Sequence, residues 1–432
     1  MRYRLKSFIA LAALSSLCAL AQEPTPPGQD TGSNTLTTLA GDFAQGNFVN
    51  FYAFVDAVHD SDQVTLNNSG VGSWGVSVGG GVDLFHQFET SVVSLSYRGD
   101  YRNYGSTSFG GGSDQNLNFV FTKRVGPRWV LSTHASAGEY FYGTPYYNYQ
   151  QNGPLTPASN PFSNETRYLS GGVSAVYRQT RRLSYILSGQ FYLTRYSYAN
   201  AIGSNGGSGS AGISYNFTAR TSLTASYVHN NFQYEQNSGS ALIDSAFLTV
   251  QHKFSRRTTA SISGGVARAH SQGTITEQAL LLVNGQPPLG SVTGPYNVVS
   301  WIPSFQGNVS HNWRRLTATA TGGQVVVPGN GIYLTSRNLY LSGTIARNWG
   351  RLHVGGGGGY YHIVSISNAR NSTYNSVSLS ATASYMLMRY IGAHATYNYY
   401  LNGSYGAYSN VADNRIAFGL NFSSKGIPLT LF

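Results

Sequence analysis

The sequence predicts an all-β protein, a transmembrane antiparallel up-and-down β-barrel of about 18 strands, with 16 as the alternative count. Three observations support this prediction. The chain opens with residues typical of an export signal, and its composition combines few charges with many aromatic rings. Apolar and polar side chains also alternate with a period of two along many segments.

The first 21 residues have the features of a secretory signal peptide. Arg2, Arg4 and Lys6 form a positive start, an apolar stretch follows, and Ala19 and Ala21 supply the small-x-small pattern that signal peptidase accepts. The apolar run is too short for a membrane anchor. We therefore predict a signal peptide at 1–21, a periplasmic N-terminal tail at 22–45 and an outer-membrane barrel at 46–432.

Cys18 is the only cysteine, so the exported chain contains none. A lipoprotein signal ending at Cys18 is disfavoured, because Leu17 stands where that signal needs a small residue. Without cysteine, disulfide-stabilised folds, thiolate metal sites and thiol catalysis are excluded.

The composition is unlike that of a soluble domain. Charged residues make up 10% of the chain, against about 25% in ordinary soluble domains. No segment after the signal holds the roughly 18 consecutive apolar residues of a membrane helix, and 13% aromatic residues are too many for a disordered chain. A membrane barrel accounts for these facts, because each strand alternates a lipid-facing apolar residue with a small or polar one that faces the lumen.

The alternation can be read directly from the sequence. Segment 376–385 places Val, Leu, Ala, Ala and Tyr at odd positions and Ser or Thr at even positions. Aromatic strand ends repeatedly run into short Arg-rich turns, as at 177–182 and 254–257, whereas longer segments join the other strand ends. Outer-membrane barrels show this asymmetry, with short periplasmic turns and longer extracellular loops. Propeller blades have similar spacing but would not show one uniformly polar face.

Both termini are expected on the periplasmic side. The predicted strands are 47–59, 71–85, 90–104, 114–124, 128–142, 164–179, 183–198, 209–219, 221–235, 242–254, 257–271, 297–313, 315–326, 333–348, 351–366, 374–388, 390–403 and 411–423. The predicted long loops are 105–113, 143–163, 199–208, 272–296 and 404–410. Trp129, Trp313 and Trp349 stand beside short turns, and Trp74 and Trp301 near the opposite strand ends, where aromatic girdles are expected.

The C-terminal segment 415–422 alternates apolar residues, and the chain closes on an aromatic one. This ending resembles the C-terminal signal of Gram-negative outer-membrane β-barrel proteins, which the barrel-assembly machinery reads during insertion. The resemblance implies that the barrel-assembly machinery is a partner of this chain. It also implies a role in assembly for Phe418, Leu420, Phe422 and Phe432. Pro428 interrupts the pattern, so the last strand either stops near Ser423 or bends at the proline.

The sequence offers little that indicates catalysis. The histidines show no ligand spacing, so His134 and His394 are interpreted as polar strand positions, and no metal or cofactor is expected. Asp60 and Asp62 lack the further ligands of a calcium loop. A Ser-His-acid site stays open as an alternative, because its members meet in space rather than along the chain. We expect that the protein is not an enzyme. A barrel hydrolase is kept as a third hypothesis, after the two that are given below.

Positive charge dominates the later part of the chain. Residues 140–432 contain 19 Lys and Arg but only 5 Asp and Glu. Strand parity places four arginines on the lumen face: Arg98, Arg102, Arg178 and Arg415. The turn arginines should ring the periplasmic mouth of the barrel: Arg181, Arg182, Arg220, Arg256, Arg257, Arg314, Arg315 and Arg351. Rings of arginine favour anions. For the turn arginines, the preferred interpretation is that they bind lipid phosphate. For the four lumen arginines, the two interpretations stand equally.

A barrel of this size encloses a bore wide enough for water. The first hypothesis is therefore a porin-like channel for passive diffusion of small hydrophilic solutes, with a preference for anions. The second is a structural or surface-interaction barrel with a blocked lumen, since loops 143–163 and 404–410 are rich in tyrosine.

Loop 272–296 contains an apolar stretch and is expected to fold inward or to pack on the barrel mouth. The expected partners are outer-membrane lipid, the assembly machinery and small solutes, with no nucleic acid; the oligomeric state is left open.

Overall fold

The protein is described by a computed structural model. It describes residues 47–61, 72–105, 111–140, 165–197, 202–235, 238–279, 290–327, 335–366, 373–402, 411–424 and 427–428. The predicted signal peptide at 1–21 and the whole of the predicted tail at 22–45 lie outside the described residues. Phe432 lies outside them as well.

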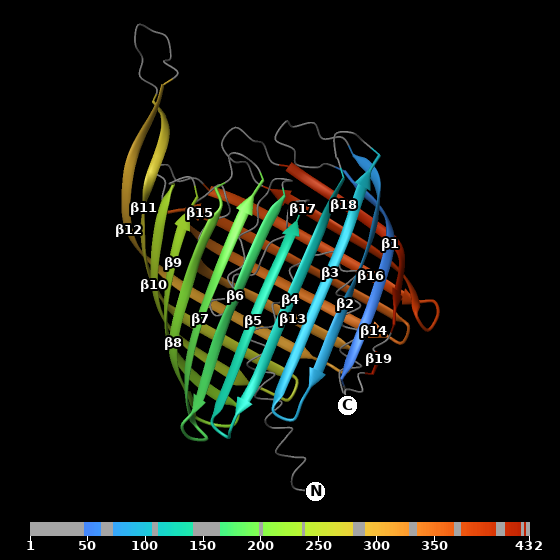
Figure 1. Cartoon of the computed structure of the whole chain (residues 1–432), viewed down its shortest axis with the longest axis horizontal. Coiled ribbons are helices and arrows are strands. Elements are labelled where there is room, and N and C mark those ends of the chain that lie inside the picture. The colour runs from blue at the N-terminus through green and yellow to red at the C-terminus, as the bar shows by residue number, and fades with distance from the viewer. Residues whose placement is uncertain are drawn as a thin grey trace.

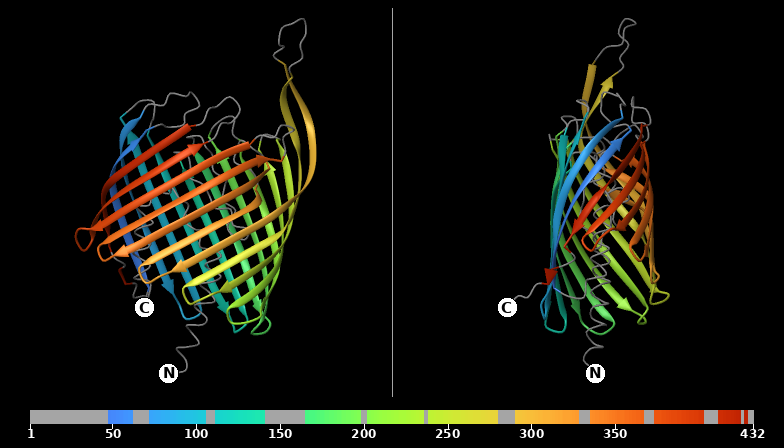
Figure 2. Two further views of the ribbon diagram at one scale, coloured as in Figure 1. Left: turned by 180° about the vertical axis from the view of Figure 1, so that it is seen from behind. Right: turned by 90° about the vertical axis from the view of Figure 1, so that its right-hand side faces the viewer.

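The described chain forms one closed antiparallel sheet (Figures 1 and 2). Each strand pairs with the next along the chain, and β18 pairs with β1 to close the barrel, with Asp60 opposite Arg415 and Tyr52 opposite Ser423. The strands are β1 (Phe48–Asp60), β2 (Ser73–Gln87), β3 (Ser91–Tyr104), β4 (Gly111–Val125), β5 (Trp129–Tyr140), β6 (Thr166–Arg178), β7 (Leu183–Tyr196), β8 (Ser204–Asn216), β9 (Thr221–Tyr234), β10 (Gly239–Lys253), β11 (Thr258–Ala279), β12 (Gly290–Asn312), β13 (Leu316–Val327), β14 (Ser336–Trp349), β15 (Leu352–Ser365), β16 (Thr373–Met386), β17 (Ile391–Asn402), β18 (Val411–Ser423) and a short β19 (Ile427–Pro428). The predicted barrel of 18 long strands is confirmed.

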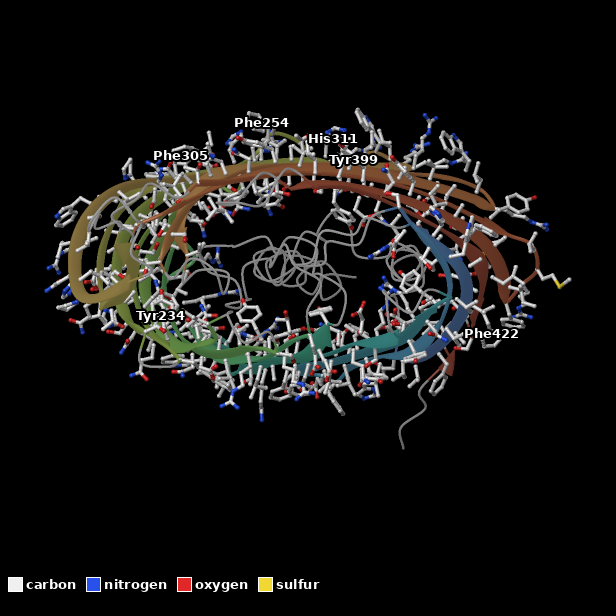
Figure 3. All side chains as sticks on the ribbon, turned by 90° about the horizontal axis from the view of Figure 1, so that it is seen from above. Tyr234, Phe254, Phe305, His311, Tyr399 and Phe422 are labelled. Atoms are coloured by element: carbon white, nitrogen blue, oxygen red, sulfur yellow. The ribbon has the colours of Figure 1, made fainter. Side chains whose placement is uncertain are left out.

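The two faces of the sheet differ as the period-two pattern predicts. On β14, Leu341 is 62% exposed on the outer surface, whereas its neighbour Ser342 is 7% exposed and faces the lumen. Seen along the barrel axis, the wall is a closed ring with an elongated cross-section, and side chains project from both of its faces (Figure 3). An apolar exterior and a polar interior reverse the arrangement of a soluble protein.

Short turns gather at one end of the barrel, where β1 begins and β18 ends (Figures 1 and 2). Gly126 and Gly350 hold positive φ angles of 66° and 60° in two of these turns. Glycine reaches that conformation without steric conflict, which allows a reversal of only a few residues. We call this end the turn end and the opposite end the loop end.

Three predicted loops are shorter in the structure than expected. β4 begins at Gly111 and β8 at Ser204, within the predicted loops 105–113 and 199–208. The largest correction concerns loop 272–296, because β11 continues to Ala279 and β12 begins at Gly290, in register throughout. The physical reason is that Thr and Val residues continue to favour extended pairing there. These arms rise above the rim rather than into the mouth (Figure 1), and residues 280–289 lie outside the described part of the chain.

The last long strand stops at Ser423, as one of the two sequence interpretations predicts. The chain then returns to the sheet, where Ile427 and Pro428 pair with Val49 and Phe48 of β1. A proline at this position lies at the margin of the sheet, where a missing N–H is tolerated. Phe418, Leu420 and Phe422 point outward and are half exposed.

The five tryptophans lie on the outer surface, and all are exposed. Trp129 and Trp349 flank turn-end hairpins, and Trp313 contacts the ring of His311 at 3.9 Å between centroids. Trp74 contacts His59 at 4.8 Å near the loop end. Among the described residues, no helix is long and apolar enough to span a membrane.

Candidate functional site on the lumen wall

The register places the four predicted lumen arginines on the inner face of the barrel. Arg98 lies over the ring of Phe54 at 5.7 Å. Arg102 lies near the loop end of β3, Arg415 lies on β18, and Arg178 ends β6 at the turn end. The structure therefore brings Arg98, Arg102 and Arg415 into one region and leaves Arg178 apart from them.

The two arginines near the loop end are held by carboxylates. Arg102 contacts Asp100 through Nε and Asp114 through an Nη atom, both at 3.2 Å. The Nε of Arg415 donates to Asp60 at 2.6 Å, and the hydroxyl of Tyr104 donates to the same carboxylate. Hydrogen bonds to charged groups inside a protein are stronger than neutral ones, so these contacts fix both guanidinium groups against the wall.

The inner face of five adjacent strands, β18 and β1 to β4, carries a group of carboxylates that the prediction missed. We call this region the acidic sector, and it contains Asp56, Asp60, Asp83, Asp100, Asp114 and Asp413. Its cationic residues are Arg98, Arg102 and Arg415, so carboxylates outnumber guanidinium groups in it. Strand parity could have found these carboxylates, if it had been applied to the acidic residues that precede position 140 and to Asp413.

His394 belongs to the edge of the acidic sector. Its Nε2 lies 3.1 Å from Asp56, and its Nδ1 lies 3.5 Å from the amide of Asn421. Both ring nitrogens therefore face β18 and β1. Ser384, which is opposite His394 on β16, has a buried hydroxyl with no hydrogen-bond partner. The serine, histidine and aspartate are thus not joined as a nucleophilic triad requires.

The wall from β4 to β14 is built mostly from uncharged polar side chains. Some of these hydroxyl and amide groups bond in pairs across neighbouring strands, whereas Ser170, Thr194, Ser304 and Ser336 carry buried hydroxyls without a hydrogen-bond partner. The pairs are Thr122–Ser132 at 3.0 Å, Ser188–Ser210 at 2.6 Å, Ser214–Thr224 at 3.0 Å, Thr249–Ser263 at 2.9 Å, Asn308–Thr321 at 2.7 Å and Thr319–Thr344 at 2.6 Å. Such cross-strand pairs stabilise the sheet and satisfy the polar groups locally.

One part of the interior near the loop end is filled by packed side chains, which we call the apolar corner. It contains Tyr192, Phe232, Tyr234, Ala241, Ile243, Ala267, Ala269, Ile302 and Val326. The hydroxyls of Tyr234 and Thr335 meet at 2.9 Å, and Ser271 contacts Thr335 at 3.1 Å. These contacts join β9 and β11 to the residue before β14, so this part of the bore is closed by the protein itself.

The predicted rim arginines all lie in or beside exposed turns at the turn end. They stand in the turns β6–β7, β8–β9, β10–β11, β12–β13 and β14–β15. Together with Arg128 of the β4–β5 turn and Arg389 of the β16–β17 turn, they form a basic ring around one mouth. The acidic sector extends along the wall from Asp83 near this end to Asp60 near the loop end.

Ion pairs also lie on the outer face toward the loop end. Arg167 contacts Glu165 and, at 3.4 Å, Glu139, whereas Arg195 contacts Glu235 at 3.2 Å. Outward-facing charges cannot lie in hydrocarbon without a large penalty. These pairs therefore mark the level at which the apolar outer belt ends.

The fold and its wall define a class: a closed β-barrel with an apolar exterior, aromatic residues toward both ends and a polar interior. No protein-family model matches the chain, and no curated protein matches it. Among solved structures, OpdK of Pseudomonas aeruginosa with vanillate is 12% identical, with 87% of this chain and 98% of that chain covered and a TM-score of 0.41. OccK2 (OpdF) of the same organism is 11% identical, with 88% and 100% covered and a TM-score of 0.42. OccAB3 of Acinetobacter baumannii is 9% identical, with 87% and 99% covered and a TM-score of 0.39. These scores describe a general likeness of shape and carry no weight for function.

Proposed function

We propose that the protein is an outer-membrane channel through which small hydrophilic solutes diffuse passively. The observation that carries this proposal is the closed barrel of 18 long strands with an apolar exterior and a polar inner face. Barrels of about eight strands are filled by their own side chains, whereas barrels of 16 to 18 strands leave an aqueous bore. A solute path lined by Ser, Thr, Asn and charged groups supports passage of hydrophilic molecules.

The outer membrane is the location we propose, with delivery through a cleaved signal peptide at 1–21. The apolar belt and the flanking aromatic residues support a membrane setting. The basic ring at the turn end suits the periplasmic face, where it would contact lipid phosphates. The outward-facing Phe418, Leu420 and Phe422 support recognition of β18 by the barrel-assembly machinery.

Anion preference stays a prediction. The basic ring at the turn end favours anions, and the carboxylates of the acidic sector oppose them. Exposed rim charges are screened over about 10 Å at 0.1 M salt, whereas charges on a confined wall are screened less. The reversal potential under a salt gradient therefore measures which of the two regions controls selectivity.

The test is single-channel recording of the refolded protein in a planar bilayer under a KCl gradient. Stable open steps would establish a pore, and the sign of the reversal potential would give its charge preference. A folded barrel that shows no steps would refute the channel proposal.

The apolar corner favours a second candidate, a surface or structural barrel whose lumen is blocked. Its packed residues close part of the bore at the loop end. Under this alternative the refolded barrel would give no steps, yet it would remain folded and resistant to protease. We favour the channel over an enzyme, because the contacts of His394 with Asp56 and Asn421 leave it unjoined to Ser384.

A further inference from the structure

The outer face of β9 to β12, four neighbouring strands, changes character toward the loop end (Figure 1). Nearer the turn end its outward residues are apolar, and Val250, Ile262 and Val266 are exposed there. Toward the loop end most outward positions of the same strands are polar. We call this region the outer polar patch, and it contains Asn231 on β9, Asp244 on β10, Arg268 and Gln272 on β11, and Asn297 and Trp301 on β12.

The register places the charged members of the patch and its indole in a single row. Asp244 on β10 is opposite His229 on β9 and Arg268 on β11. Arg268 is in turn opposite Trp301 on β12. Side chains directly opposite on one face of an antiparallel pair lie about 5 Å apart, so the row is continuous across the four strands. Trp301 stands at its end and is 67% exposed, which leaves its ring open to a ligand.

The carboxylate of Asp244 is oriented through one of its oxygens. Oδ1 accepts from the hydroxyl of Tyr227 at 2.6 Å and lies 2.8 Å from Nδ1 of His229. Oδ2 lies 4.0 Å from Nη1 of Arg268, a separation longer than a hydrogen bond. A ligand hydroxyl at this position can donate to the carboxylate and accept from the guanidinium. The side chain of Arg268 is 45% exposed, so a ligand outside the barrel reaches it.

Amide and apolar side chains continue the patch above this row. Asn231, Gln272 and Asn297 are exposed, and each side-chain amide has both a donor and an acceptor. Leu242 and Val299 lie among them and are exposed as well. Sugars carry hydroxyls at the ring edge and C–H groups on the ring face. A surface that combines amides, a carboxylate, a guanidinium and an exposed indole therefore suits a sugar.

We propose that the outer polar patch binds the sugar headgroup of a glycolipid in the outer leaflet. The patch lies on the outside of the barrel and continues directly from the apolar belt, so acyl chains on the belt bring a headgroup to the patch. A sugar ring stacks on Trp301, and its hydroxyls bond to Asp244, Arg268 and the amides. Because Asp244 and Arg268 offset each other in charge, the patch selects the sugar rather than a lipid phosphate. This inference rests on the proposed outer-membrane location and does not require an open pore.

The test measures lipid binding to the refolded, detergent-solubilised barrel by native mass spectrometry. Two anionic lipids with several acyl chains are titrated in parallel. Rough lipopolysaccharide carries a short chain of sugars, whereas cardiolipin carries phosphates and no sugar. We expect lipopolysaccharide to bind at lower concentration than cardiolipin. Equal binding of the two lipids would overturn the inference, because phosphate and acyl chains alone would then account for it.

A matched pair of variants locates the effect. Trp301→Ala removes the indole of the patch, and Trp74→Ala removes an exposed indole from the outer face of β2, where it lies against His59 and Phe418. Trp301→Ala should weaken lipopolysaccharide binding about five- to tenfold, and Trp74→Ala should leave it unchanged. Asn231→Leu, which removes one amide at nearly constant volume, should weaken it about two- to fivefold. Equal weakening by the two tryptophan variants would show a general effect of the aromatic girdle and would contradict a specific site.

The sugar chain released from the lipid separates two sources of the same chemistry. We expect the released chain to bind more weakly than the intact lipid, because it lacks the acyl chains that lie on the belt. If it binds as tightly, the patch takes a free glycan and the assignment to a membrane lipid is wrong. The outcome is independent of the channel proposal. A folded barrel that gives no open steps but selects lipopolysaccharide refutes the channel and supports the patch, and open steps without lipid selection do the reverse.

Discussion

Arg415 on the last long strand donates to Asp60 on the first, with 2.6 Å between Nε and Oδ1. The two residues are also opposite each other in the backbone register that closes the barrel. Asp60 is completely buried and also accepts from Tyr104 of β3. One carboxylate thus joins three strands at the closure, where the sheet has no chain connection to hold its edges together.

Replacing this carboxylate should weaken the barrel. Asp60→Asn keeps the volume but leaves Arg415 buried without its counter-charge, which typically costs about 3–5 kcal/mol. Urea unfolding in detergent or lipid should show a lower free energy of unfolding by that amount. Asp244→Asn is the control, because Asp244 lies on the outer face in contact with Tyr227, His229 and Arg268, and it should cost less than Asp60→Asn. Equal losses in the two variants would contradict a special role for the closure pair.

The rim arginines should affect selectivity in a way that depends on salt. Arg256→Gln combined with Arg257→Gln removes two positive charges beside the turn-end mouth, so the reversal potential should move toward cations. The shift should shrink at 1 M salt, where the Debye length is about 3 Å. Arg347→Gln is the control, because Arg347 lies on the outer face against Trp349, 4.5 Å from its ring centroid, and should leave selectivity unchanged. A shift of equal size at high salt would point instead to a structural change.

Arg102 should have a larger effect than any rim residue. Arg102→Gln leaves the carboxylates of Asp100 and Asp114 without their shared counter-charge inside the lumen. The reversal potential should move strongly toward cations, and it should do so even at raised salt, because charges on a confined wall are screened less. Asp83→Asn should shift it in the opposite direction. If both variants leave the potential unchanged, the acidic sector does not lie along the ion path.

The apolar corner should contribute to stability rather than to conduction. Phe232→Ala removes a ring that is 1% exposed and should lower the free energy of unfolding by about 3–5 kcal/mol. Single-channel conductance should stay the same, because the corner is closed by its own packing. A rise in conductance without loss of stability would show that the corner acts as a gate.

The extended hairpin should be dispensable for conduction. The arms of β11 and β12 rise above the rim (Figure 1), so deleting 275–293 and joining the ends with a short glycine-rich turn should leave conductance unchanged. Because the arms pair only with each other there, barrel stability should be unaffected as well. A clear increase in conductance would restore the sequence-based expectation of an inward-folded constriction.

The strands and the direction of their side chains could be predicted because period-two alternation is a local property. Every long strand overlaps a predicted range, and exposed and buried residues alternate along β14 as the period-two pattern predicts. The extension of β11 and β12 was missed, because a loop with an apolar stretch and a strand continuing above the rim share the same local composition.

The sequence by itself determined the alternation, the turn chemistry and therefore the two faces of the wall. Only the tertiary structure decided which residues meet across it. Asp60 and Arg415 are separated by 355 positions, and Tyr234 and Thr335 by 101. Their contacts depend on the register with which the sheet closes and on the elongated cross-section of the barrel, and neither is encoded within a single strand. The same closure gathers the acidic sector from five strands.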